Sequence, residues 1–153
     1  MNGEPKKPTY TLQPEELILF LEQVFALDQE ASHINAPDCL RRLQEHENEF
    51  KGTDHEDRYW YLISLECLHI AQVAAQESRT EEAVTMLQQA IAAAMKQDDA
   101  DWTRYLEATL AYLQSDVGKV RELKDRCGMN SKTVSRLLHG LDARGSSDYA
   151  RDY

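Results

Sequence analysis

Hydroxyl and cationic side chains cluster near the C-terminal end of the chain, at the start of a predicted helix over 131–141. They are Ser131, Lys132, Thr133, Ser135 and Arg136. Backbone N–H groups and the helix dipole favour phosphate at a helix N-terminus. Arginine pairs with guanine edges, and lysine and hydroxyl side chains bond bases or phosphates. Side chains of these types at this end of a helix predict entry into a DNA groove.

A second predicted helix, 117–126, must hold this helix in place. Gly128 separates the two helices and indicates a turn, and Ser131 can cap the helix that follows. The supporting helix also carries cations that can contact the DNA backbone. They are Arg121, Lys124 and Arg126.

The segment VRELKDRCGMNSKTVSRLLHGL, 120–141, resembles the helix-turn-helix of phage-repressor and antidote-type transcription factors. On this resemblance, Leu123 and Val134 pack the two helices together and Leu137 closes their core. Gly128 makes the turn, with Met129 tucked behind it. The resemblance implies a transcriptional regulator that binds double-stranded DNA.

Lys124 departs from the family pattern, which has Ala or Gly where the two helices cross closely. A lysine stem can run out to solvent with its charged head in water. The family's domain has additional helices, whereas here a predicted helix over 102–114 precedes the pair. The sequence therefore predicts a minimal three-helix unit.

Residues 64–97 resemble a single tetratricopeptide unit. Small residues there, including Ala71, Ala83 and Ala90, would let two antiparallel helices approach closely. The segment departs from the family at Ala74, where a bulky aromatic is usual, and at Met95, where a proline is usual. No second copy is detectable at the same period, so a generic antiparallel helix pair is the alternative.

Helical periodicity extends over most of the chain. All four prolines fall in the first 37 residues and the glycines lie near predicted ends or turns. We expect an all-α fold of about seven helices in antiparallel hairpins, with Asn35 and either Ser78 or Thr80 as N-caps. The predicted helices are 14–30, about 37–50, 58–76, one that follows the cap at Ser78 or Thr80 and reaches Ala94, 102–114, 117–126 and 131–141.

The pattern predicts four regions along the chain. They are a disordered arm (1–11), an acidic tetratricopeptide-like body (12–98), a helix-turn-helix-like unit (99–142) and a disordered tail (143–153).

Charge is distributed unevenly along the chain. Residues 1–115 carry 21 acidic and 9 basic side chains, a balance of −12, whereas residues 116–145 carry 4 acidic and 7 basic ones, a balance of +3. DNA would repel most of the molecule and attract this end. Affinity would then depend on base contacts or on dimerisation.

Other reactive side chains form no recognisable motif in the sequence. The histidines near acidic residues, His46, His55 and His69, lack the HExxH spacing of a metal site. Cys67 and His69 are two residues apart and cannot share a helix face. We therefore expect no enzyme activity, no cofactor and no metal site, and Cys67 and Cys127 are predicted to pack in the core.

Three separated cysteines without a CxxC pair favour a reducing compartment. The apolar runs are too short to span a bilayer, so we expect a soluble, cytoplasmic protein that has no membrane partner.

Two functions follow from these observations. The first is a DNA-binding transcriptional regulator whose helical body senses a signal or forms a homodimer. The alternative is a protein-interaction adaptor without DNA binding, whose surface over 36–110 would favour a basic partner.

Overall fold

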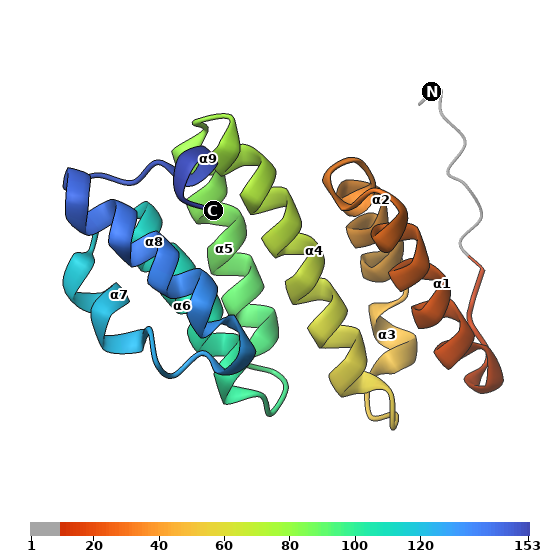
Figure 1. Ribbon diagram of the computed structural model, residues 1–153. Helices are drawn as coiled ribbons and strands as arrows, with labels where there is room; N and C mark the ends of the chain where they lie inside the picture. The colour runs from red at the N-terminus through yellow and green to blue at the C-terminus, as the bar shows by residue number, and fades with distance from the viewer. Residues whose placement is uncertain (1–9) are drawn as a thin grey trace.

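The computed structural model describes residues 10–153, in which helices are joined by short loops and no strand is present (Figure 1). The all-α class with antiparallel packing is confirmed. The α-helices are α1 (Leu17–Glu30), α2 (Ser32–Glu45), α3 (Glu47–Phe50), α4 (Glu56–Gln76), α5 (Thr80–Ala94), α6 (Ala100–Leu113), α7 (Val117–Leu123), α8 (Ser131–Arg144) and α9 (Tyr149–Asp152). Short 3-10 helices lie at Pro14–Glu16 and Gly128–Asn130. Most of the predicted arm, residues 1–9, lies outside the described residues.

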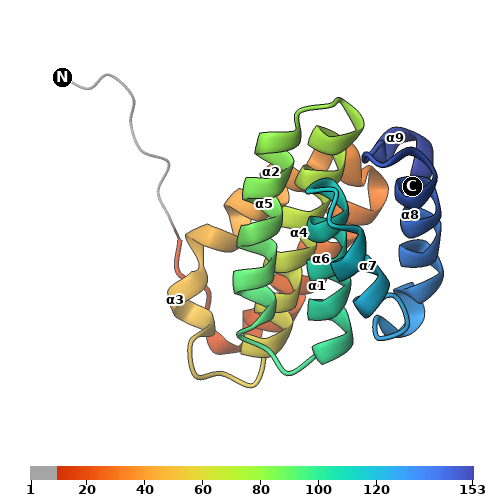
Figure 2. The same cartoon turned by 90° about the vertical axis from the view of Figure 1, so that its left-hand side faces the viewer.

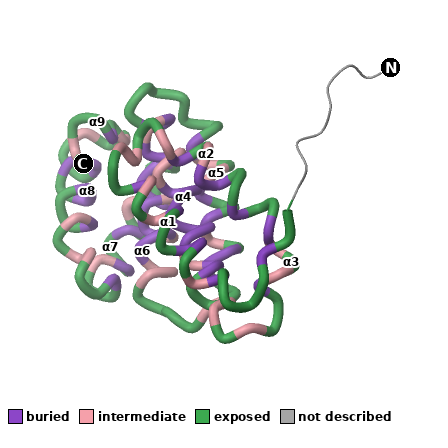
Figure 3. The backbone as a smooth tube through the Cα atoms, turned by 90° about the vertical axis from the view of Figure 1, so that its right-hand side faces the viewer, coloured by how far each residue is buried: buried purple, intermediate pink, exposed green. Residues whose placement is uncertain are grey.

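Helices that follow one another in the chain lie side by side. Figure 1 shows a row that runs from α1 and α2 through α4 and α5 to α6, α7 and α8 at the other end. The α4 helix contacts α1, α2, α5 and α9, and 13 of its 21 residues are buried. Figure 3 shows the buried backbone concentrated in the interior of the row. Polar residues on α4 are therefore enclosed from several sides.

The α4–α5 pair packs through small side chains. Ala71, Ala74, Ala83 and Ala90 are each at most 1% exposed, which lets the two helices approach closely. The predicted helical hairpin is therefore present. The predicted cap is wrong, because Arg79 occupies the N-cap of α5 without a side-chain bond and Ser78 takes a left-handed conformation (φ +63°).

The second helix starts five residues earlier than its predicted start near Pro37. It begins at Ser32, and Pro37 lies inside it. Asn35 does not cap the helix but donates from its side-chain amide to the carbonyl oxygen of Leu27 at 2.8 Å. Proline inside a helix removes one hydrogen bond and crowds the carbonyl four residues earlier, and the burial of Ala36 and Cys39 acts against this cost.

The prediction of a disordered tail over 143–153 is wrong. The α8 helix continues to Arg144, and α9 then packs against α8 and α4 (Figure 2). Tyr149 is 3% exposed, and its hydroxyl accepts a hydrogen bond from Gln72 Nε2 at 3.0 Å. The hydroxyl of Tyr112 in α6 accepts from the backbone N–H of Asp148 at 2.7 Å. Tertiary contacts of this kind order the tail.

Candidate functional site

The C-terminal unit is built from α6, α7 and α8, each of which contacts the other two. Asp99 caps α6 by accepting from the N–H of Trp102, and Asp116 caps α7 by accepting from the N–H of Lys119. The predicted core residues are all at most 3% exposed, as is Cys127. They are Leu123, Val134 and Leu137. These side chains are therefore buried in the unit in which α7 and α8 contact each other.

The turn between α7 and α8 differs from the prediction in one residue. Gly128 has φ +57°, a conformation that glycine adopts without steric cost. Met129 is 94% exposed and does not tuck behind the turn. Cys127 fills that position, with its Sγ donating to the carbonyl oxygen of Leu123 at 3.2 Å.

One face of α8 carries exposed polar side chains. Lys132, Ser135 and Arg136 lie on it at helical spacing, as predicted, and His139 extends it by one turn. His139 was not among the predicted site residues, although its spacing of three from Arg136 and four from Ser135 was a sufficient signal. This face points away from the core formed by Val134 and Leu137.

Ser131 and Thr133 are only partly exposed and lie off this face. Ser131 is the first residue of α8 and does not cap it; its hydroxyl accepts from the backbone N–H of Cys127 at 3.3 Å. The hydroxyl therefore faces the turn, and Asn130 occupies the N-cap without a side-chain bond.

The three predicted backbone-contacting cations lie in different surroundings. Arg121 is exposed on α7 and pairs with Asp142 of α8 at 3.2 Å. Lys124 is partly exposed at the C-cap of α7, outside the buried core of the unit. Arg126 is exposed, and its carbonyl oxygen accepts from Arg104 Nε at 2.6 Å.

The α9 helix flanks the C-terminal half of the α8 face. A hollow of about 530 Å³ lies between them, lined by Arg136, His139 and Arg151 among others. Asp152 of α9 accepts from the guanidinium of Arg144 and from the hydroxyl of Tyr112. The N-terminal half of α8, which carries Lys132 and Ser135, remains exposed beyond α9.

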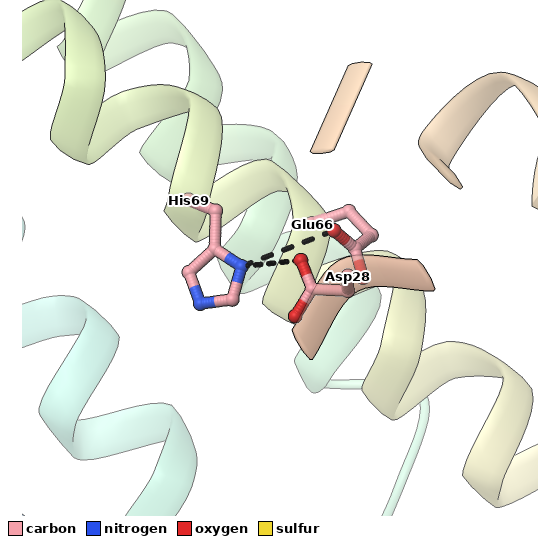
Figure 4. A group of neighbouring side chains, drawn as sticks. All are labelled: Asp28, Glu66 and His69. Carbon is pink, nitrogen blue, oxygen red and sulfur yellow. Dashed lines mark hydrogen bonds and ion pairs between the residues drawn. The ribbon is translucent and has the colours of Figure 1, made fainter. Parts of the chain in front are cut away.

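A second group of reactive side chains lies inside the helical body, between α1 and α4 (Figure 4). The Nδ1 atom of His69 is 2.8 Å from Asp28 Oδ1 and 3.9 Å from Glu66 Oε1. Asp28 and Glu66 are both 0% exposed. Neither carboxylate oxygen of Glu66 has a hydrogen-bond partner among the described residues.

The surroundings of this group change its protonation. Burial raises the pKa of Glu66 to about 8, although His69 acts in the opposite direction; the charge of Asp28 adds to the rise. Burial alone would lower the pKa of His69, but the Glu66 and Asp28 carboxylates raise it above its usual value. A buried cluster of this composition can hold a proton or a cation.

In the sequence, His69 was related to Cys67 and to the acidic residues around 45–57, but not to Glu66 or Asp28. The signal for Glu66 was its spacing of three residues from His69, which places both on one face of α4. Asp28 could not be found in this way, because it comes from another helix 41 residues before His69.

No protein-family model, no curated protein and no solved structure matches this chain. Among residues 10–153, no helix is both long enough and apolar enough to cross a bilayer.

Proposed function

We propose that the chain is a DNA-binding transcriptional regulator that reads double-stranded DNA with α8. The observation that carries the proposal is the exposed face on which Lys132, Ser135 and Arg136 lie together at the N-terminal half of the helix. A recognition helix contacts base edges with its N-terminal residues. Arginine pairs with the O6 and N7 atoms of guanine, and lysine and serine bond bases or phosphates.

The supporting residues keep a smaller role in this proposal. Arg126 contacts a phosphate on the flank of the groove. Lys124 also contacts a phosphate, with the exposed end of its side chain. Arg121 can do so after exchanging Asp142 for phosphate. Thr133 contributes its backbone N–H group at the helix N-terminus in preference to its side chain, because it lies off the exposed face. The N–H of Ser131 donates to the carbonyl oxygen of Gly128, so Ser131 acts by holding the turn that positions α8.

Charge restricts how DNA can approach. The balance of −12 over residues 1–115 repels a duplex, while the balance of +3 over residues 116–145 attracts it. Non-specific binding is then weak, and useful affinity requires base contacts from two copies on paired half-sites. A homodimer formed through the helical body supplies the second α8.

The test is selection of the full chain on a random duplex library, followed by fluorescence anisotropy on enriched sequences at two salt concentrations. Arg136→Ala should weaken specific binding by about 10- to 100-fold, since a good bidentate contact contributes about 1–3 kcal/mol. The matched control is Arg58→Ala, which removes the same charge from an exposed position on α4 and should leave binding unchanged.

An enriched palindrome that loses affinity in Arg136→Ala but not in Arg58→Ala supports the proposal. Absence of enrichment, with both variants folded, contradicts it and favours the alternative. In that case the body would be an adaptor, and its acidic surface would select a basic protein partner.

A further inference from the structure

Two carboxylates are enclosed in the helical body with one imidazole beside them. Asp28 and Glu66 are fully buried, and the side chain of His69 is 16% exposed. Both oxygens of Glu66 lack a hydrogen-bond partner among the described residues. Leaving a buried polar group unsatisfied destabilises a fold, and more so when the group is charged. A cation bound among these side chains would satisfy it.

The donor atoms are arranged around a common point. One ligand atom from each of the three side chains lies within 4.8 Å of the other two. Bonds of about 2.1 Å that meet at a tetrahedral angle separate donors by about 3.4 Å. Small side-chain rotations therefore suffice to close the group around one cation. Figure 4 shows all three side chains directed toward one another from α1 and α4.

The group is held by helices and supported from outside. Asp28 lies near the end of α1, and Glu66 and His69 lie one turn apart on α4. The side-chain amide of Gln29 donates to Asp28 Oδ2 at 3.1 Å. A hydrogen bond of this kind orients a ligating carboxylate and increases metal affinity. The other oxygen, Asp28 Oδ1, faces His69 and stays available to bind a cation.

The donor set selects the kind of cation. Imidazole suits zinc and neighbouring transition metals, whereas magnesium and calcium prefer sites made only of oxygen donors. Two carboxylates and one imidazole also balance the charge of a divalent ion. The nearby thiol of Cys39 donates to the carbonyl oxygen of Val24 at 3.6 Å and stands outside the group.

We propose that Asp28, Glu66 and His69 bind one divalent transition-metal ion of the zinc class inside the helical body. The ion replaces the proton between His69 Nδ1 and Asp28, and three protein ligands leave a coordination position open for water or a small ligand. This site is separate from the proposed DNA interface, and it departs from the sequence-based expectation of no metal.

The test uses the full chain and two probes. Cobalt(II) reports its coordination number through visible absorption, and zinc(II) competes with it under equilibrium dialysis. Glu66→Gln keeps the shape of the side chain and removes its negative charge. Glu22→Gln makes the same change at an exposed position on α1 and serves as the matched control. Circular dichroism of each variant checks the fold.

We expect one equivalent of cobalt in a site of four or five ligands, displaced by zinc. Glu66→Gln should weaken zinc binding by at least about 100-fold, at or beyond the upper end of the roughly 10- to 100-fold loss that follows removal of an outer partner. Glu22→Gln should bind zinc as the unchanged chain does. Asp28→Asn, a second ligand variant, should weaken binding similarly.

Equal zinc affinity in the unchanged chain, Glu66→Gln and Asp28→Asn would overturn the proposal, because exposed histidines and carboxylates would then account for all binding. If Glu66→Gln failed to fold, Asp28→Asn would decide the outcome by the same comparison. DNA binding that persists in zinc-free Glu66→Gln would leave the proposed function standing whatever the result for the metal.

Discussion

At the scale of single residues, Asp152 links the tail to the rest of the molecule. Its carboxylate accepts from Arg144 Nη1 at 3.0 Å and from the hydroxyl of Tyr112 at 2.6 Å, and its side chain is only 6% exposed. Hydrogen bonding to Arg144 holds the pKa of Asp152 below its usual value of 3.8, although burial opposes the shift. The ionised form is therefore the one that the fold stabilises.

This lowered pKa predicts loss of stability in acid. The unfolded chain takes up the Asp152 proton at higher pH than the folded chain, so the contribution is full above pH about 4 and is lost as the pH falls through the folded pKa. Asp152→Asn should reduce the free energy of unfolding by about 1–3 kcal/mol at pH 7. Its stability should also change less between pH 5 and 3. Urea unfolding across this range measures both effects, and an unchanged pH dependence would refute the assignment.

At the scale of elements, Gly140 controls the contact between α8 and α9. A Cβ on Gly140 would overlap the carboxylate of Asp152. Gly118 on α7 has room for a Cβ, whose nearest neighbour would be Asp116 Oδ1 at 3.8 Å. Close packing of α9 therefore requires a glycine at position 140, whereas the packing around position 118 does not.

Gly140→Ala should displace α9 from α8 without unfolding the row of helices. Amide protection over 149–153 in hydrogen exchange should fall by about tenfold or more, because local opening costs less free energy than global unfolding. Gly118→Ala should leave this protection unchanged and stabilise α7 by up to about 1 kcal/mol. Equal protection in the two variants would mean that α9 does not depend on the close approach at Gly140.

Helices with a continuous apolar stripe could be predicted from the sequence, as α4 and α6 show, whose ends lie within two residues of the predicted ones. The predictions that failed concerned parts of the structure that depend on contacts between distant segments. The tail carries little periodic signal, and it is ordered by Gln72 and Tyr112, which lie 77 and 36 residues before their partners. The buried group was missed for the same reason, because local spacing relates Glu66 to His69 but says nothing about Asp28.

At the scale of the whole molecule, the C-terminal unit and the helical body share their packing. The α6 helix contacts α5 on one side and α7 and α8 on the other. The indole N–H of Trp102 in α6 donates to the hydroxyl of Ser64 in α4 at 2.8 Å. The predicted boundary between the body and the C-terminal unit lies between residues 98 and 99. The hydrophobic core therefore continues across this boundary.

Leu137→Ala tests how far this continuity reaches. Leu137 is 0% exposed in the core of the C-terminal unit, and its truncation should cost about 2–5 kcal/mol of unfolding free energy. If the packing is continuous, circular dichroism and tryptophan fluorescence should show one common transition at lower denaturant, since helices and both tryptophans unfold together. Leu19→Ala, at an exposed leucine on α1, should cost less than about 1 kcal/mol. Two separate transitions in Leu137→Ala would show instead that α6 to α9 unfold as an independent unit, and the proposed DNA-binding end could then change its stability without disturbing the buried group in the body.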